Sequence, residues 1–379
     1  MKLLNNLTRY LIYVLLIFTP LAQGAVHGWA ITAIHLITLV ALTSFLQATT
    51  ISWTWKSIKI PHFLPVMILF IFNVVSLLHS INFDTSFWAL ALLSDYIVIF
   101  YLIICTTTTR AQLRQLVHLI IFIATFLSVF GLFKWGGANP FPWWEYHLGY
   151  NKDMLSSTYG NHNHLAGYME MAIPMALGLF LTGLKKGRFI FMSVLTLTLF
   201  SALILSQSRG GWIGSFAGLS FLVIVLLTNR YFKKKRLLSA LATTGIVIVL
   251  VVLSSTPVVT RILSFEQKTK IPNFRDRVIV WKAVSRAIPD KPLLGTGPGT
   301  FATVFTQYQP PGFAGPYYMA HNDYLQFIIE LGLPLIALIV WMAVILYRRG
   351  FSKLKNPSRL VRGVTLGALS GITAILIHS

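Results

Sequence analysis

Two arginines and a histidine are the residues of this chain whose types and spacing best support chemistry. Arg209 occupies the centre of a Ser-Gln-Ser-Arg-Gly-Gly-Trp segment, Arg277 precedes a tryptophan by four positions, and His321 begins a His-Asn-Asp triplet. Each lies at or beside the predicted outer end of an apolar run, where charged groups are costly unless they have a function. Guanidinium groups bind phosphate oxygens bidentately, and a neutral imidazole accepts a proton from a hydroxyl. The three residues therefore predict a site for a diphosphate-bearing lipid substrate.

Further polar residues flank these three and are candidate substrate-binding residues. They are Asn161, Asn163, Ser208, Arg275 and Asn322. The two asparagines alternate with histidines in Asn-His-Asn-His, where hydrogen bonding to sugar or pyrophosphate competes with a less favoured metal site.

Each of the other candidates also has a structural alternative. Arg275 either contacts substrate or pairs with Asp276, and Asp323 either caps a helix or serves the site. Arg209 must occupy a tight turn between two spans, with Gly210 and Gly211 allowing the bend. Its side chain either lines a pocket, as the surrounding serines and glycines favour, or extends to lipid phosphates.

The elements that position these residues are membrane helices. Of the 379 residues, 55% are hydrophobic and 11% charged, and the mean hydropathy is +0.71, whereas soluble domains carry about 25% charged residues. Apolar runs of about 20 residues cross the hydrocarbon as helices. The sequence therefore predicts an all-α, polytopic helical membrane protein. Eleven spans are predicted, at roughly 7–23, 28–48, 62–80, 87–105, 113–135, 162–183, 189–207, 211–228, 237–256, 321–346 and 360–379.

Positive charges indicate the orientation of these spans. If the N-terminus is cytoplasmic, the inner segments hold most of the 31 lysines and arginines and none of the ten acidic residues, a strong positive-inside pattern. We expect a multi-pass protein of the cytoplasmic (inner) membrane with its site on the outer face. The basic run 233–236 adjoins a span, so membrane lipids are a better partner for it than nucleic acid.

The pattern of spans and loops suggests three regions. We predict a membrane domain of nine helices at 1–256, an outer loop domain at 257–320, and the last membrane helices at 321–379. Within the outer loop, a short amphipathic helix is expected to start near Asp276 and to stop at Pro289.

A glycine-rich segment follows that amphipathic helix. The segment 292–299 has three alternating glycines, which form either a phosphate-binding nest or, as we favour, an ordinary tight turn.

The order and spacing of these motifs resemble the O-antigen ligase/polymerase family of bacterial cell-surface glycan transferases. The resemblance is carried by the segments 161–167, 206–212, 277–281, 292–299, 321–325 and 330–334. One departure is His162, where many members of the family have arginine. The first 130 residues or so resemble the family only in being hydrophobic spans.

The resemblance implies a GT-C-like arrangement of about twelve spans with one larger periplasmic loop. Because the last run ends at Ser379 without a tail, we expect a further C-terminal part. The family resemblance also implies an enzyme of lipopolysaccharide or surface polysaccharide assembly. The donor would be a glycan on undecaprenyl diphosphate, and the acceptor lipid A-core, another glycan or a protein. Arg209 and Arg277 match the family's essential arginines, and His321 matches its essential histidine.

These residues predict a metal-independent, inverting glycosyl transfer that needs no cofactor. The arginines stabilise the departing diphosphate, and His321 deprotonates the acceptor hydroxyl. Ligases, polymerases and protein O-oligosaccharyltransferases of this family share the motifs.

Two non-enzymatic functions are the alternatives. A flippase or transporter of lipid-linked glycan is expected to place charged groups near the bilayer midplane, whereas those of this chain cluster at one face. A scaffold subunit is expected to tolerate loss of His321.

Overall fold

The computed structural model describes residues 2–52, 62–141, 154–182, 185–232, 274–313 and 317–379, and all regular structure within these ranges is helical. The predicted all-α class is therefore confirmed. The chain divides into two compact units. The first comprises Met1–Trp53, Leu102–Val259 and Tyr347–His378, and the second comprises Thr54–Tyr101, Thr260–Leu346 and Ser379.

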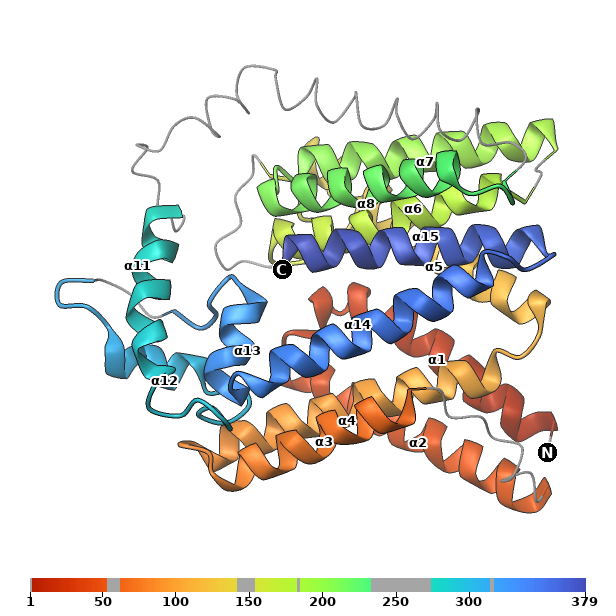
Figure 1. The fold of residues 1–379 in the computed structure, drawn as a ribbon. Coiled ribbons are helices and arrows are strands. Elements are labelled where there is room, and N and C mark those ends of the chain that lie inside the picture. Colours follow the sequence, from red (N-terminus) through yellow and green to blue (C-terminus); the bar gives the residue numbers. More distant parts are fainter. Residues whose placement is uncertain (1, 53–61, 142–153, 183–184, 233–273, 314–316) are drawn as a thin grey trace. The chain divides into compact units, whose positions relative to one another are not determined.

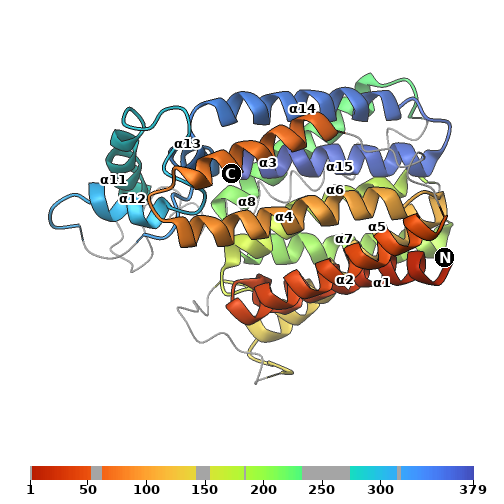
Figure 2. The same ribbon diagram turned by 90° about the horizontal axis from the view of Figure 1, so that it is seen from below.

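The first unit is built of long helices (Figure 1). Its helices are α1 (Lys2–Leu21), α2 (Gly28–Ser52), α5 (Arg110–Trp135), α6 (His162–Phe180), α7 (Lys186–Leu205), α8 (Arg209–Thr228) and α15 (Arg359–His378). Helices α6, α7, α8 and α15 lie side by side, and α1 packs along α2 (Figure 2).

The second unit combines membrane-length and short helices. Its helices are α3 (Phe63–Leu78), most of α4 (Phe83–Thr106), α11 (Phe274–Val284), α12 (Phe301–Tyr308), α13 (Asp323–Leu331) and the first part of α14 (Pro334–Lys353). A 3₁₀ turn, Ser285–Ala287, extends α11. The predicted amphipathic helix is thus confirmed as α11. Its buried Val280 and Val284 pack in one core with Phe301 and Phe305 of α12.

Eight of the described helices are long and apolar enough to cross a membrane. They are Leu3–Leu21, Gly28–Ile51, Phe83–Thr106, Arg110–Trp135, Lys186–Leu205, Arg209–Thr228, Pro334–Lys353 and Arg359–His378. Two other predicted spans also form helices but are not among these eight. Helix α3 has only 16 residues, and α6 begins with the polar residues His-Asn-His. The predicted span 237–256 lies outside the described residues. The chain is therefore a polytopic helical membrane protein.

One span was predicted as a single helix, and this prediction is wrong. The apolar run 321–346 is divided between α13 and α14, because Gly332 adopts a φ of 83° and Pro334 begins the next helix. A positive φ ends a right-handed helix, and proline is favoured at the first position of a new one. The division of the chain at 1–256, 257–320 and 321–379 stays a prediction. The two compact units do not test it, because each combines stretches that are separate in sequence.

Glycines on two helix faces bring α15 close to its neighbours in the first unit. A methyl group added at Gly363 or Gly367 of α15 would meet backbone atoms of α6, and one added at Gly214 or Gly218 of α8 would meet backbone atoms of α15. Small residues at four-residue spacing allow helix backbones to approach closely, which is how membrane helices gain packing energy. These glycines therefore hold α15 between α6 and α8.

Replacing Gly367 with alanine is expected to destabilise the first unit by about 1–3 kcal/mol, the usual cost of overpacking. Its Cβ would lie 2.6 Å from the Pro174 carbonyl oxygen and 2.7 Å from Met175 Cα, which are backbone atoms. Thermal unfolding of the purified protein measures this effect. Gly187→Ala is the matched control, because nothing lies within 4 Å of a Cβ there. Equal stability of the two variants would contradict the packing argument.

Candidate active site

The turn between α7 and α8 is fixed by a cap and a buried tryptophan. The Ser208 hydroxyl accepts a hydrogen bond from the Gly211 N–H at 3.2 Å and so caps α8. The Trp212 indole N–H donates to the Leu203 carbonyl at 3.2 Å. The predicted tight turn is confirmed, and it places Arg209 at the first position of α8 with an exposed side chain.

The bend in this turn has a different cause from the one expected. Gln207 adopts the left-handed conformation, with a φ of 55°, whereas Gly210 and Gly211 lie inside α8. The two glycines serve close packing, because a methyl group on Gly210 would meet the His378 ring and one on Gly211 would meet Ala166. The expectation that these glycines allow the bend is therefore wrong.

The Asn-His-Asn-His segment is joined to this turn. Asn161 caps α6 by accepting a hydrogen bond from the Asn163 N–H at 2.8 Å. The His162 ring bonds through Nδ1 to the Ser206 carbonyl at 2.7 Å. Two motifs that are 44 residues apart in sequence are thus adjacent in the first unit.

The structure shows local structural roles for some of these residues, whereas their contact with substrate is untested. Asn161, His162 and Ser208 each have a local structural role. Contact of Asn161, Asn163 or Ser208 with substrate stays a prediction. No group of three or more potential metal ligands occurs in the part of the chain that the structure describes.

A buried hydrogen bond between a glutamate and a histidine supports the beginning of α8 and was missed by the sequence analysis. Glu170 of α6 is fully buried, and its Oε1 lies 2.8 Å from His378 Nδ1 at the end of α15. The His378 ring lies against Gly210, next to Arg209, and the second Glu170 oxygen lies against Gly214. This pair therefore connects the three packed helices just where Arg209 begins α8. The sequence signals for it were the glycine spacing in α8 and a glutamate inside the apolar run 162–183.

In the second unit, a side chain of α11 fixes the segment that leads to His321. The Trp281 indole N–H donates to the Ala320 carbonyl at 2.7 Å, and the Gln326 side-chain oxygen accepts from the Ala320 N–H at 3.2 Å. Asn322 then caps α13 by accepting from the Leu325 N–H at 2.9 Å. His321 lies between these two fixed positions, exposed and with a φ of 52°.

These contacts decide between alternatives that the sequence left open. Asn322 is the cap of α13, whereas Asp323 is its first residue. A non-glycine residue in the left-handed region is uncommon and is often found at functional sites. The backbone thus presents the His321 imidazole outward from a rigid turn.

Tyr317 lies against His321, and the positive charge of Arg277 acts on its hydroxyl. The Tyr317 and His321 rings meet edge to face, with centroids 6.2 Å apart. Burial raises the pKa of the Tyr317 hydroxyl, Asp276 raises it further, and the positive charge of Arg277 opposes them. Arg277 is half-buried in the first turns of α11. The predicted histidine thus packs on Tyr317, and the charge of the predicted arginine acts on the hydroxyl of that tyrosine, while Arg275 lies in the first turn of α11.

Glu330 organises the glycine-rich segment in front of α12. Its carboxylate accepts hydrogen bonds from the Gly299 N–H at 2.8 Å, the Phe301 N–H at 3.2 Å and the Gln326 amide at 3.0 Å. Burial raises the pKa of the Glu330 carboxyl, and these three donors counteract part of that rise. The Gly297 N–H donates to the Glu330 carbonyl at 2.9 Å.

These bonds favour the turn over the phosphate nest. Gly295, Gly297 and Gly299 all have positive φ angles. Their amides, however, donate to protein acceptors, so the favoured interpretation of this segment as a tight turn agrees with the structure.

Replacing Glu330 with leucine is expected to destabilise the second unit by about 1–3 kcal/mol for each donor left without an acceptor. The Gly299 and Phe301 amides both lose their partner, and α12 loses the acceptor at its N-terminal end. Glu330→Gln is the control, because it keeps one carbonyl oxygen and should cost less. Denaturant unfolding compares the two variants. A leucine variant as stable as the unaltered protein would refute this role.

The candidate residues divide between the two units. Arg209 lies in the first unit, and Arg277 and His321 lie in the second. His321 lies beside Tyr317 and the charge of Arg277 acts on that tyrosine, whereas convergence of all three residues on one cavity stays a prediction.

Fold and site together define a polytopic helical membrane protein with conformationally fixed polar residues at helix beginnings. Residues 194–340 match the model of a family described as O-antigen ligase. Over this range the chain is similar to the O-antigen ligase family, and the matched range includes Arg209, Arg277 and His321. No curated protein matches the chain. The Asn161 segment and the Glu170–His378 pair lie outside the matched range.

Proposed function

We propose that this protein is an O-antigen ligase-type glycosyltransferase. It moves a glycan from an undecaprenyl-diphosphate carrier to an acceptor hydroxyl on the outer face of the cytoplasmic membrane. The family match supports glycan transfer by an enzyme. The observation that carries the proposal is the fixed presentation of His321 beside Tyr317, with Arg277 acting on the same tyrosine. A general base and a phosphate-binding guanidinium are the two groups that this chemistry requires.

The proposed reaction is a single displacement at the anomeric carbon. The acceptor oxygen forms a bond to that carbon while the bond from carbon to the diphosphate oxygen breaks, which inverts the configuration. His321 takes the proton from the acceptor hydroxyl. The electron pair of the broken bond leaves with the diphosphate, whose added charge Arg209 and Arg277 stabilise through bidentate hydrogen bonds. The arginines do this work without a metal ion.

Arg209 is suited to this role by its position. It begins a 20-residue helix, and the positive end of a helix dipole favours an anion. The Glu170–His378 pair and the Ser208 cap fix that helix beginning. Asn161, Asn163, Arg275 and Asn322 are proposed to contact the sugar or the pyrophosphate around these three residues.

The acceptor distinguishes this proposal from its nearest alternatives. An O-antigen-type polymerase transfers to another glycan, and a protein O-oligosaccharyltransferase transfers to a hydroxyl of a protein. Both use the same chemistry as transfer to lipid A-core. A flippase for lipid-linked glycan, by contrast, leaves the bond between glycan and diphosphate intact.

The test is transfer by the purified protein in lipid vesicles. The protein is incubated with an undecaprenyl-diphosphate glycan and, separately, with lipid A-core, a glycan or a protein acceptor, in excess chelator. We expect a new glycosidic bond of inverted configuration, identified at the reducing end by mass spectrometry and NMR, together with free undecaprenyl diphosphate. Movement of intact donor without transfer would refute the enzyme, and activity restored only by a divalent ion would refute the metal-independent mechanism.

The orientation in the membrane is tested by labelling. Lys186 and Lys282 are both exposed, and the positive-inside pattern predicts that they face opposite sides of the membrane. In a variant in which alanine replaces Cys105, Lys282→Cys should react with an impermeant thiol reagent in intact spheroplasts, and Lys186→Cys only after lysis. The reverse pattern would place the site on the cytoplasmic face.

A further inference from the structure

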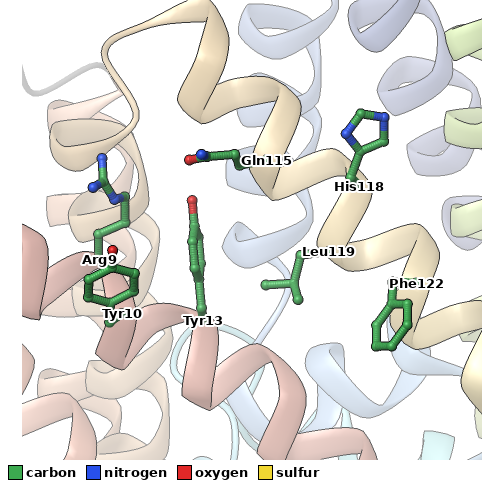
Figure 3. Close-up of a pocket in the computed structure, with 7 residues that line it drawn as sticks. All are labelled: Arg9, Tyr10, Tyr13, Gln115, His118, Leu119 and Phe122. Atoms are coloured by element: carbon green, nitrogen blue, oxygen red, sulfur yellow. The ribbon is translucent and has the colours of Figure 1, made fainter.

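A cavity of about 440 Å³ opens near the beginnings of α1 and α5 in the first unit (Figure 3). Arg9 and Tyr13 line it from α1, and Gln115, Leu119 and Phe122 line it from α5. The Tyr13 ring and the Gln115 side chain extend toward one another across it (Figure 3). The cavity thus has polar groups on both helices and an apolar continuation along α5.

Two polar atoms in this cavity lack a hydrogen-bond partner within the described part of the chain. They are Arg9 Nε and the Tyr13 hydroxyl, and both are buried. Buried polar groups normally have a hydrogen-bond partner, so these two atoms are available to a group that enters the cavity. The other end of the Arg9 guanidinium is held by the Asn6 side-chain oxygen at 2.8 Å. Arg9 is therefore oriented by the protein, and its buried Nε–H has no acceptor among the described residues.

The charge of the cavity selects an anion. Arg9 is the only charged residue of the membrane-length segment Leu3–Leu21, and a charged residue within a span marks a functional position by default. None of the described residues that line the cavity is acidic. The positive charges of Arg114 and Arg188 act on His118, which also lines it. A guanidinium, a phenol and an amide can all donate to phosphate oxygens.

The shape of the cavity selects a lipid. Leu119 and Phe122 follow Gln115 by one and two helical turns, and the Phe122 side chain is 67% exposed. At a rise of about 1.5 Å per residue, the polar and apolar parts of α5 extend over roughly 10 Å. A headgroup phosphate at Arg9 and Tyr13 would therefore direct an acyl chain along Leu119 and Phe122, toward the middle of the bilayer.

We propose that this cavity binds a phospholipid with an anionic headgroup, in the leaflet at the N-terminal ends of α1 and α5. Arg9 and Tyr13 bind the phosphate, Gln115 assists, and the apolar surface of α5 holds one acyl chain. This inference is independent of the proposed glycan transfer. The positive-inside pattern predicts that the leaflet is the cytoplasmic one, where anionic lipids attract basic residues.

The test compares lipids added to the full-length protein in neutral detergent. Phosphatidylglycerol should remain bound in native mass spectrometry and raise the melting temperature. Phosphatidylcholine with the same acyl chains should do so more weakly, and glycerol phosphate, which lacks the chains, should have no effect. Arg9→Gln should weaken phosphatidylglycerol binding about tenfold, the equivalent of one charge-assisted hydrogen bond. Tyr13→Phe keeps the ring and should weaken binding by a smaller factor.

The control is Arg110→Gln, which removes an exposed positive charge at the beginning of α5 without altering the cavity lining. It should bind phosphatidylglycerol like the unaltered protein. Equal loss in the Arg110 and Arg9 variants would mean a diffuse charge effect and would overturn the proposal. Equal binding of the two phospholipids, or unchanged binding in both cavity variants, would overturn it as well. If Arg9→Gln lowers the melting temperature in the absence of lipid, its loss of binding could come from unfolding. The Tyr13→Phe variant alone then tests the proposal.

Discussion

Replacing His321 with alanine is expected to lower the rate of glycan transfer by about 10²–10⁴, the usual contribution of a positioned general acid or base. The acceptor hydroxyl then attacks the anomeric carbon without giving up its proton to the protein. Donor binding should change little, because the proton that His321 takes belongs to the acceptor. The measurement is kcat and KM for a defined lipid-diphosphate glycan, together with the Kd of the donor in the absence of acceptor.

The control for this prediction is His79→Ala, which removes an exposed histidine elsewhere in the second unit. That variant should retain full activity. His321→Gln keeps a hydrogen-bonding side chain but cannot act as a base, so it should be nearly as slow as the alanine variant. Turnover that survives in both His321 variants would remove His321 from the mechanism, and loss of donor binding would assign it to substrate binding instead.

Replacing Arg277 or Arg209 with lysine is expected to lower the transfer rate almost as much as replacement with alanine. Removal of one donor that stabilises transition-state charge costs about 10²–10³ in rate. Lysine restores the charge but not the planar fork that binds two phosphate oxygens at once. The comparison of alanine and lysine variants at each position, by kcat with saturating donor, measures how much of the effect depends on that geometry.

Arg286→Lys is the matched control, because Arg286 is exposed in the 3₁₀ turn that follows α11. It should leave the rate unchanged. Full activity of the Arg277 and Arg209 lysine variants would reduce their role to a diffuse positive charge and would contradict bidentate binding of the diphosphate.

The same variants test whether the two arginines act on one diphosphate. Residues that share a ligand give non-additive effects in a double-mutant cycle, with interaction energies of about 0.5–3 kcal/mol. We expect the Arg209 and Arg277 double variant to be less impaired than the product of the single effects predicts. If the rate loss of the double variant equals the product of the two single rate losses, the arginines serve separate steps. That result would contradict their convergence on one cavity.

Hydropathy predicted most of the helices because a membrane span has to be apolar over a fixed length. Most of the predicted spans coincide with helices to within a few residues, as in α5 and α15. The break between α13 and α14 was missed because residues 321–346 have the overall length and hydropathy of one span, although Gln326 and Glu330 interrupt its first part. The local signal was present in Gly-Leu-Pro at 332–334, where backbone conformation outweighs hydropathy.

The cap residues show how far local sequence reasoning extends. Ser208 and Asn161 were expected to bind substrate, yet their side chains also accept hydrogen bonds from the helices that they begin. A short polar side chain before an apolar run fits both roles, so the residue type alone does not separate them. The same ambiguity affects Asp323, for which a capping role was one expectation. In the structure, Asn322 is the cap of α13.

By itself, the sequence determined the helical membrane class, the family motifs, and Arg209, Arg277 and His321 as the candidate residues. These depend on composition and local spacing, which are readable along one chain. Only the tertiary structure decided which distant groups meet. The Glu170 and His378 side chains are 208 residues apart in sequence but 2.8 Å apart in space, and Trp281 holds Ala320 across 39 residues. Such pairs depend on which faces of packed helices come together, and helix packing is set by close contact of side chains and glycines that hydropathy does not encode.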